Sequence, residues 1–325
     1  MNKQLCREAL ELMLKSRFFE EKTEEMFKAG LIHGTTHLAN GQEASQAGLC
    51  LALDKDDWIV PTHRCHGFTL CKGSDPFAMF SEMLGSSNGL AKGLGGSMHM
   101  PDKGMCNLGS SAVVGSGVPL ATGIAFWMKK SGRNNLSVAI FGDGASSRGG
   151  VHESMNIASI WKLPVLFYCE NNLYGMSARS DKMISVHDIS QRAASYSMRG
   201  KTVDGNDVEA VYNAVKEASA YIKEGNGPYL LEVKTYRFKG HSKSDRRLYR
   251  TEEEEQLWLK RDPIVLFEKK LVESGIMAQS EIEKTESRCA LEIKTAAQNA
   301  LEHEDERLTQ QQALNLVYAQ DKERS

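Results

Sequence analysis

The pattern of apolar and polar positions divides the chain into three stretches. At the start, apolar side chains recur at helical spacing, which predicts an amphipathic helix over residues 3–28. Residues 30–119 are rich in glycine and histidine and predict only short helical pieces, such as 75–84. From residue 120 the pattern becomes regular. Short apolar runs predict buried strands at 136–141, 164–170 and 228–236, and amphipathic stretches predict helices at 119–132, 149–161 and 207–225.

The alternation of strands and helices predicts an α/β fold class. Strands that alternate with helices form a parallel sheet covered on both faces, so we expect a three-layer, doubly wound, mostly parallel sheet. No domain boundary is evident before about residue 260. We therefore expect one α/β domain over 1–260, with a helical extension of the same domain over 261–325. Thr251 and Glu254 have the spacing of a capping box at the start of a helix.

Composition narrows the range of partners and compartments. The chain has 325 residues and a formal net charge of −2, so no excess of basic residues indicates a nucleic acid or an anionic membrane as partner. No apolar run approaches the roughly 20 residues that a membrane helix needs. The seven cysteines are scattered and lack C-x-x-C spacing, which indicates free thiols. We expect a cytoplasmic protein without membrane or nucleic-acid partners.

A glycine-rich turn, "FGDGASSRGG" at 141–150, directly follows the first buried strand. Such a turn can hold a phosphate, but the dinucleotide fingerprint G-x-G-x-x-G fails because its third glycine is replaced by Ser147. The "GKT" at 200–202 likewise lacks the first glycine of a P-loop, since that position is Ser195. An NAD-dependent dehydrogenase therefore stays only a remote alternative.

Asp143, inside this turn, indicates a metal. A carboxylate repels phosphate unless a cation lies between them, and Asn172 follows the next strand along the chain. Parallel strands joined by one crossover end at the same edge of a sheet, so the two side chains should meet there. Their oxygens suit Mg²⁺ bound to phosphate. The alternative is local: Asp143 caps the following helix and Asn172 makes a turn.

The residues from 142 to 177, a Gly-Asp-Gly followed by paired asparagines, resemble the thiamin diphosphate motif. The whole stretch is similar to the alpha subunit of the decarboxylating component of 2-oxo acid dehydrogenase complexes. Four further blocks match that family in the same order: "THRCHG" (62–67), "KGLGGSMHM" (92–100), "VVGSGVPLATGIA" (113–125) and "TYRFKGHSKSD" (235–245). The resemblance covers nearly the whole chain and implies the thiamin diphosphate-binding fold.

The resemblance also implies the roles of individual residues. Mg²⁺ would be bound by Asp143, Asn172 and the backbone carbonyl of Tyr174. The catalytic histidines would be His241, near the reaction centre, and His66. Gly144 and Ala145 would offer backbone N–H groups to the diphosphate at a helix start. The full set expected to bind the cofactor is His63, Arg64, Val114, Gly142, Asp143, Gly144, Ala145, Asn172, Tyr174 and His241.

Some positions depart from the family or allow another interpretation. His63 stands where pyruvate enzymes often have tyrosine, and Ala112 where many relatives have glycine. Ser242 aligns with a serine that is phosphorylated in mitochondrial relatives, and here it is taken as a loop residue. The "HRCH" run with Cys71 fits no usual zinc spacing. The remaining histidines are interpreted as structural or solvent-facing: His33, His37, His99, His152, His187 and His303.

The resemblance implies an oxidoreductase that is half of an active site. A beta subunit would complete a heterotetramer of two alpha and two beta chains, and a lipoyl-bearing acyltransferase would accept the product. "THR" instead of "YR", a glutamine-free "VVGSGVPLA" and "GHSKSD" favour acetoin as the small-molecule substrate. Pyruvate or another 2-oxo acid is the alternative. A subunit that has lost its cofactor is a further alternative, against which the intact Asp143, Asn172, Arg64 and His241 argue.

Overall fold

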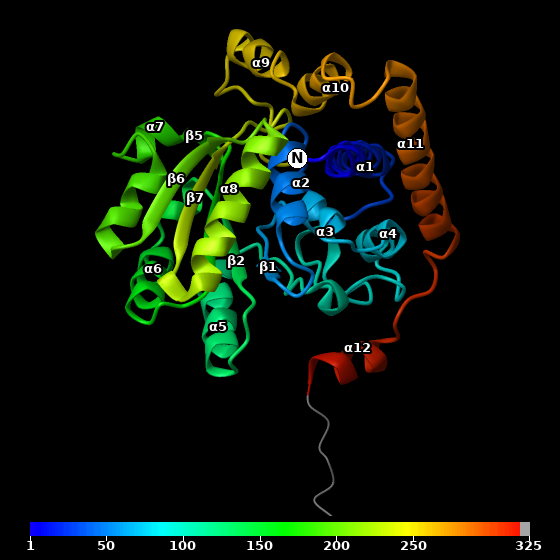
Figure 1. Cartoon of the computed structure of the whole chain (residues 1–325). Helices are drawn as coiled ribbons and strands as arrows, with labels where there is room; N and C mark the ends of the chain where they lie inside the picture. The colour runs from blue at the N-terminus through cyan, green and yellow to red at the C-terminus, as the bar shows by residue number, and fades with distance from the viewer. Residues whose placement is uncertain (319–325) are drawn as a thin grey trace, which may run out of the picture.

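The protein is built around one parallel sheet of five strands (Figure 1). The structure, a computed structural model, describes residues 1–318. Every neighbouring pair in this sheet is parallel. In spatial order the strands are β1 (Trp58–Val60), β2 (Ser137–Gly142), β3 (Val165–Asn171), β7 (Tyr229–Lys234) and β6 (Arg199–Asp204). The predicted α/β class with a mostly parallel sheet is confirmed.

Helices cover both faces of the sheet. Alternate residues of β2 enter different cores: Val138 and Ile140 pack with α2 (Glu43–Ala52) and α8 (Val208–Tyr221). Ala139 and Phe141 pack with α5 (Gly117–Lys130) and α6 (Gly149–Ile160) on the opposite face. A strand buried on both faces is apolar at most positions, which explains why the largely apolar run "LSVAIF" is an interior strand of the sheet.

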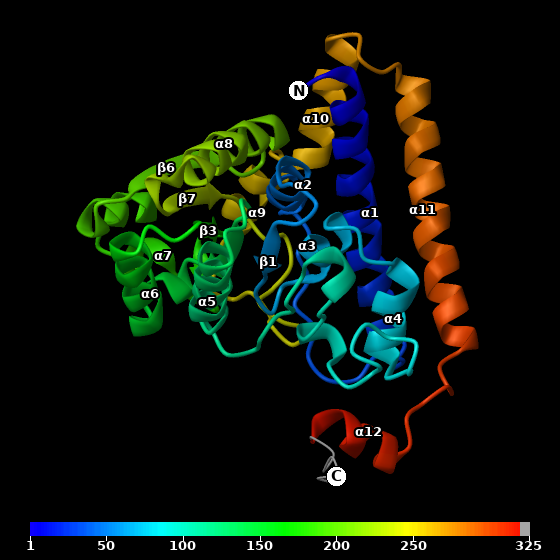
Figure 2. The ribbon, with the colours of Figure 1, turned by 60° about the horizontal axis from the view of Figure 1, so that its bottom comes forward.

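Beyond α2 lies a further helical layer that extends the larger core. The predicted N-terminal helix is α1 (Lys3–Lys28), and it packs against α2, α3 (His66–Cys71) and α11 (Gln279–Glu302). Figure 2 shows α11 beside α1 and α4 at the edge of the molecule. The remaining helices of this layer and of the chain end are α4 (Pro76–Leu84), α9 (Glu252–Leu259), α10 (Pro263–Glu273) and α12 (Gln310–Val317).

Short elements complete the chain. A two-stranded antiparallel hairpin joins β4 (Tyr174–Gly175) to β5 (Ala178–Arg179), and α7 (Ser180–Met183) follows it. A π-helical turn, η5 (Ile222–Asn226), ends α8 with Gly225 at φ 82°. The 3-10 turns are η1 (Gly96–Met98), η2 (Lys103–Met105), η3 (Gly144–Ser147) and η4 (Ile189–Tyr196). Residues 319–325 of the expected C-terminal extension lie outside the described part of the chain.

The capping box predicted at the start of α9 is half wrong. Thr251 does accept a hydrogen bond from the backbone N–H of Glu254, at 3.2 Å. The Glu254 carboxylate, however, does not return to the cap, because it accepts hydrogen bonds from Tyr174 and Tyr236 and pairs with Arg179. Tertiary partners therefore take the side chain that a free helix would use locally.

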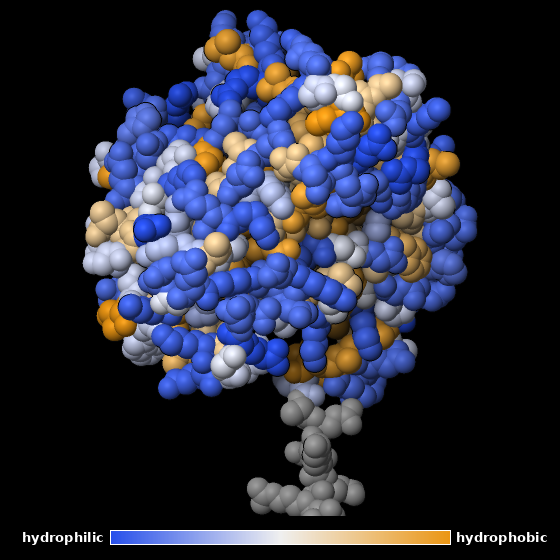
Figure 3. Space-filling view, in the orientation of Figure 1, coloured by the Kyte–Doolittle hydropathy of each residue, from blue (hydrophilic) through white to orange (hydrophobic). Residues whose placement is uncertain are grey.

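The surface is predominantly hydrophilic in the view of Figure 3, with small apolar areas among charged side chains. In residues 1–318, no helix is long and apolar enough to cross a membrane.

Candidate functional site

A cavity of about 360 Å³ opens at the carboxyl ends of β2 and β3. Open α/β sheets bind ligands at this edge. All ten residues expected to bind a cofactor line this cavity: His63, Arg64, Val114, Gly142, Asp143, Gly144, Ala145, Asn172, Tyr174 and His241. They come from five separate segments of the chain, which the sheet and its connections bring together.

Asp143 and Asn172 each direct an unpartnered oxygen into buried space. Asp143 directly follows β2 and is 2% exposed, and its Oδ2 has no hydrogen-bond partner within residues 1–318. Asn172 directly follows β3. Its Nδ2 donates to Gln42 Oε1 at 3.0 Å, and its Oδ1 finds no partner in the same part of the chain. Burial raises the pKa of the Asp143 carboxyl to about 6. Buried polar atoms are rarely left unpaired, so these two oxygens fit a hard cation.

The local alternative for the two residues does not hold. Asp143 makes no side-chain capping hydrogen bond at the start of η3, and α6 begins only at Gly149. The turn after β3 is made by Asn171, whose Oδ1 accepts from the backbone N–H of Leu173 at 3.0 Å. Asn172 is therefore free of the role that the alternative gave it.

The turn after β2 approaches the β4–β5 hairpin closely. A Cβ on Gly144 would lie 3.1 Å from the Gly175 Cα, and a Cβ on Gly175 would lie equally close to Gly144. Both positions need glycine because the two backbones meet there. One expectation is wrong in detail: Gly144 and Ala145 lie in the 3-10 turn η3, not at the start of α6. The α6 dipole therefore does not reach an anion through these residues.

Arg64 supplies a buried cation on the wall of the cavity. Its guanidinium donates to the backbone carbonyls of Leu38 and His241 and is 4% exposed. Burial, assisted by the nearby Arg237, lowers the pKa of Arg64 to about 10. Glu170 lines the same cavity and accepts a hydrogen bond from Ser45 at 2.8 Å. Burial raises the pKa of Glu170 to about 7, so this carboxyl group is only partly ionised at neutral pH. A dianionic phosphate group fits beside Arg64.

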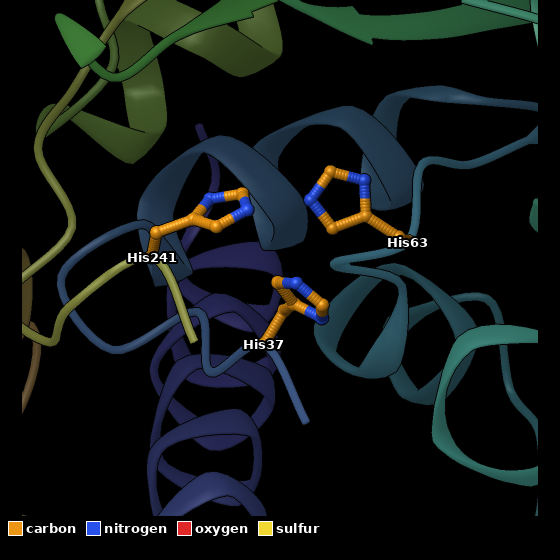
Figure 4. A group of neighbouring side chains, drawn as sticks. All are labelled: His37, His63 and His241. Carbon is orange, nitrogen blue, oxygen red and sulfur yellow. The ribbon is translucent and has the colours of Figure 1, made fainter. Parts of the chain in front are cut away.

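Three histidines meet at the wall of the cavity (Figure 4). His63 and His241 line the cavity, and His37 packs edge-on against both, with ring centroids 4.5 and 4.9 Å apart. Burial lowers the pKa of His37 to about 2, of His63 to about 3 and of His241 to about 4. The rings are therefore neutral at neutral pH, and each offers one hydrogen-bond acceptor and one donor.

His37 was missed by the sequence interpretation, which counted it among the structural or solvent-facing histidines. Three histidines at positions 37, 63 and 241 have no shared spacing, so the sequence carries no signal that they meet. The β5 strand, α7 and the residue after it also contribute cavity residues that no motif included, namely Ala178, Ser180, Met183 and Ile184.

His66 lies outside this cavity. It is fully buried, with its Nδ1 2.9 Å from Glu20 Oε2 and its Nε2 2.9 Å from Ser97 Oγ. These contacts join α1, α3 and the loop at η1. The geometry shows His66 as a buried connection between these segments, and its expected catalytic role stays a prediction.

Comparison with known proteins assigns the chain to a family. The profile of the family described as "Dehydrogenase E1 component" matches residues 11–308. The chain belongs to this family. Among its relatives, the alpha subunit of acetoin:2,6-dichlorophenolindophenol oxidoreductase from Bacillus subtilis (strain 168) is 44% identical over 74% of this chain and 73% of its own length.

Other members of the E1 family carry a different substrate in their names. The pyruvate dehydrogenase E1 component subunit alpha of Rhizobium meliloti (strain 1021) is 41% identical, over 84% of this chain and 78% of its own. The corresponding subunit of Rickettsia bellii (strain RML369-C) is 36% identical, over 92% of this chain and 93% of its own length. Membership of the E1 family makes the chain part of a thiamin diphosphate-dependent oxidoreductase, as the sequence resemblance implied.

Proposed function

We propose that this chain is the alpha subunit of a thiamin diphosphate-dependent acetoin dehydrogenase. The observation that carries the proposal is the pair of unpartnered, buried oxygens on Asp143 and Asn172, in a cavity that also holds a buried arginine. The acetoin-oxidising relative, 44% identical, supports acetoin as the substrate.

The proposed role of this subunit is to hold the diphosphate end of the cofactor. Asp143, Asn172 and the carbonyl of Tyr174 would bind Mg²⁺, because hard oxygen donors suit that ion. Arg64 would pair with the diphosphate, and the backbone of Val114, which also lines the cavity, would contact the aminopyrimidine ring. Bound thiamin diphosphate supplies a carbanion that attacks the substrate carbonyl and an electron sink for the carbon–carbon bond that breaks.

The chain's own chemical groups near the substrate are the neutral rings of His63 and His241. A neutral imidazole can donate a hydrogen bond to an oxygen that becomes negative, and it can take the proton of a hydroxyl group. Acetoin carries both groups: a carbonyl that is attacked and a hydroxyl that must lose its proton before the bond breaks.

We infer a beta subunit as the partner that completes the site, in a heterotetramer of two alpha and two beta chains. Large apolar side chains beside the cavity are exposed: Val113, Val114, Met176 and Met183. Apolar side chains gathered at a cavity mouth are typical of a surface that another chain covers. A lipoyl-bearing acyltransferase would accept the two-carbon product. We also propose the cytoplasm as the compartment, since all seven cysteines are free thiols.

The proposal is tested by coexpressing the chain with a beta chain of the same family. Thiamin-dependent dye reduction is then compared for acetoin, pyruvate and branched-chain 2-oxo acids. We expect kcat/KM for acetoin to exceed that for pyruvate by at least about tenfold, equivalent to about 1.4 kcal/mol. Pyruvate is the second candidate, supported by the relatives at 41% and 36% identity, and a reversed preference would favour it. Full turnover by the alpha chain alone would contradict its assignment as half of a site.

A further inference from the structure

The three histidines of the cavity form a cluster that the proposed reaction does not fully use. One ring nitrogen of each of His37, His63 and His241 lies within 4.8 Å of the others. Figure 4 shows each ring turning a nitrogen toward the space between them. The three residues come from separate segments, the loop before α2, the loop after β1 and the loop after β7. Convergence of three imidazoles on one point is the donor set of many metal sites.

A second observation concerns His37 itself. It is 7% exposed, and its Nδ1 has no hydrogen-bond partner among the described residues. A buried imidazole nitrogen left unpaired carries a desolvation penalty, so it calls for a ligand. The three rings are also neutral at neutral pH because burial lowers their pKa values. Neutral rings need lose no proton to bind a metal.

We propose that His37, His63 and His241 form a second metal site, which takes a divalent transition metal of the class that prefers nitrogen donors, such as Zn²⁺. The site is separate from the oxygen donors Asp143 and Asn172, which suit Mg²⁺. Since His63 and His241 line the cavity, a bound ion occupies its wall and excludes the substrate. The metal therefore inhibits the enzyme. The site consists only of side chains of this chain, and it does not depend on which substrate the enzyme takes.

The surrounding charges set the strength of the site. Arg64 donates to the backbone carbonyl of His241, and the charges of Arg64 and Arg237 oppose a cation near the rings. Asp245 acts in the other direction: its carboxylate accepts from the His241 backbone N–H at 2.6 Å. Zn–N bonds of 2.0–2.1 Å also require the three rings to close on the ion. The site should thus bind more weakly than a closed structural zinc site, as fits a reversible inhibitor.

The test uses the full-length chain, freed of metals by chelation and kept in excess Mg²⁺ so that the oxygen donors are occupied. Co²⁺ serves as the probe, because its visible absorption reports nitrogen coordination, and Zn²⁺ is added to displace it. We expect one equivalent of Co²⁺ to bind. His37→Gln, His63→Gln and His241→Gln should each weaken binding by more than about 100-fold, the upper end of what loss of an outer-shell partner costs.

Two control variants make the result specific. His187→Gln changes an exposed histidine that pairs with Asp188, and Asp143→Asn changes the oxygen-donor site. Both should keep the affinity for Co²⁺. His241→Gln, on a half-exposed loop, allows the measurement if His37→Gln fails to fold. Absence of a Co²⁺ spectrum in the wild-type chain, or equal weakening in His187→Gln, would overturn the proposal.

Discussion

Asp143 is a single residue whose position suits a functional role at the cost of the stability of the folded chain. It is a carboxylate buried to 98%, and one of its oxygens is unpaired. Burial disfavours the charged form of this carboxyl and raises its pKa to about 6. A bound cation would remove that penalty. The glycine motif around Asp143 made this residue predictable, because a carboxylate inside a phosphate-binding turn repels phosphate unless a cation lies between them.

The first prediction concerns the stability of the metal-free chain. The folded pKa of Asp143 is raised above the ordinary value of 3.8. The contribution of Asp143 to the free energy of unfolding is therefore fully present below about pH 4, and it is lost as the pH rises to about 6. Asp143→Asn avoids that loss. We expect the variant to be more stable than wild type by about 1–3 kcal/mol above pH 6.

Urea unfolding of the full chain in Mg²⁺-free buffer, from pH 4 to pH 8, measures this difference. The stability curves of variant and wild type should converge toward pH 4. A variant less stable than wild type at pH 7.5 would show that the Asp143 charge is favourably paired in the folded chain.

The second prediction separates a structural role of His66 from a catalytic one. Replacing it with glutamine leaves the buried Glu20 and Ser97 without their shared partner. We expect His66→Gln to lower the free energy of unfolding by about 2–4 kcal/mol. The exposed His303, which pairs with Glu306, provides the control, because His303→Gln should cost less than about 1 kcal/mol. A stable His66→Gln chain with an altered pH profile of turnover would restore the catalytic role.

At the scale of elements, apolar runs in the sequence predicted the interior strands of the sheet, whereas the short or polar strands β1 and β6 were not predicted. β2, β3 and β7 are buried on both faces and appear in the sequence as predominantly apolar runs, although β7 contains the buried Glu232. The edge strand β6, "RGKTVD", has only exposed and half-buried positions and no apolar pattern, and β1 is only three residues long. Sequence pattern was likewise insufficient at the start of helix α9. The Glu254 side chain does not form the predicted capping box, because it accepts hydrogen bonds from residues that only the fold brings near.

The third prediction follows from those partners of Glu254. Its carboxylate accepts from the Tyr174 hydroxyl at 2.9 Å and pairs with Arg179 at 2.7 Å, so it holds both strands of the β4–β5 hairpin. That hairpin carries the carbonyl expected to bind the metal. We expect Glu254→Gln to weaken Mg²⁺-dependent binding of thiamin diphosphate about tenfold.

Isothermal titration of the coexpressed complex measures this affinity. Tyr174→Phe keeps the carbonyl and loses the hydroxyl, so it should weaken binding similarly, and the double variant should add little. The matched control is Glu253→Gln, an exposed position on the same helix. Equal weakening by Glu253→Gln would show a general effect of charge on α9 instead of positioning.

At the scale of the whole molecule, the parallel sheet accounts for the site. Its topology puts the ends of β2 and β3 side by side, and this juxtaposition of Asp143 and Asn172 could be predicted from strand order alone. The approach of His37 could not, because it depends on how three loops pack above the sheet edge. Motifs thus gave the residues on strand ends and glycine turns, and tertiary packing decided the positions of His37 and His66.

The fourth prediction concerns assembly. The exposed apolar side chains at the cavity mouth, Val113 and Met183 among them, should be covered by the beta subunit. Coexpressed chains should therefore elute as a complex with a mass of two alpha and two beta chains, measured by light scattering. Val113→Glu should shift the mass toward smaller species, whereas a stable tetramer of alpha chains alone would contradict the proposed partner.

The most direct test of the central claim is the Mg²⁺ dependence of thiamin diphosphate binding to the coexpressed complex, measured by calorimetry for wild type and for Asp143→Asn. We predict that the wild-type affinity rises with Mg²⁺ concentration. The variant, although folded, should bind at least about 100-fold more weakly, a loss of about 2.7 kcal/mol, and should not respond to Mg²⁺. An unchanged affinity in Asp143→Asn, with its Mg²⁺ response intact, would contradict the assignment of this site.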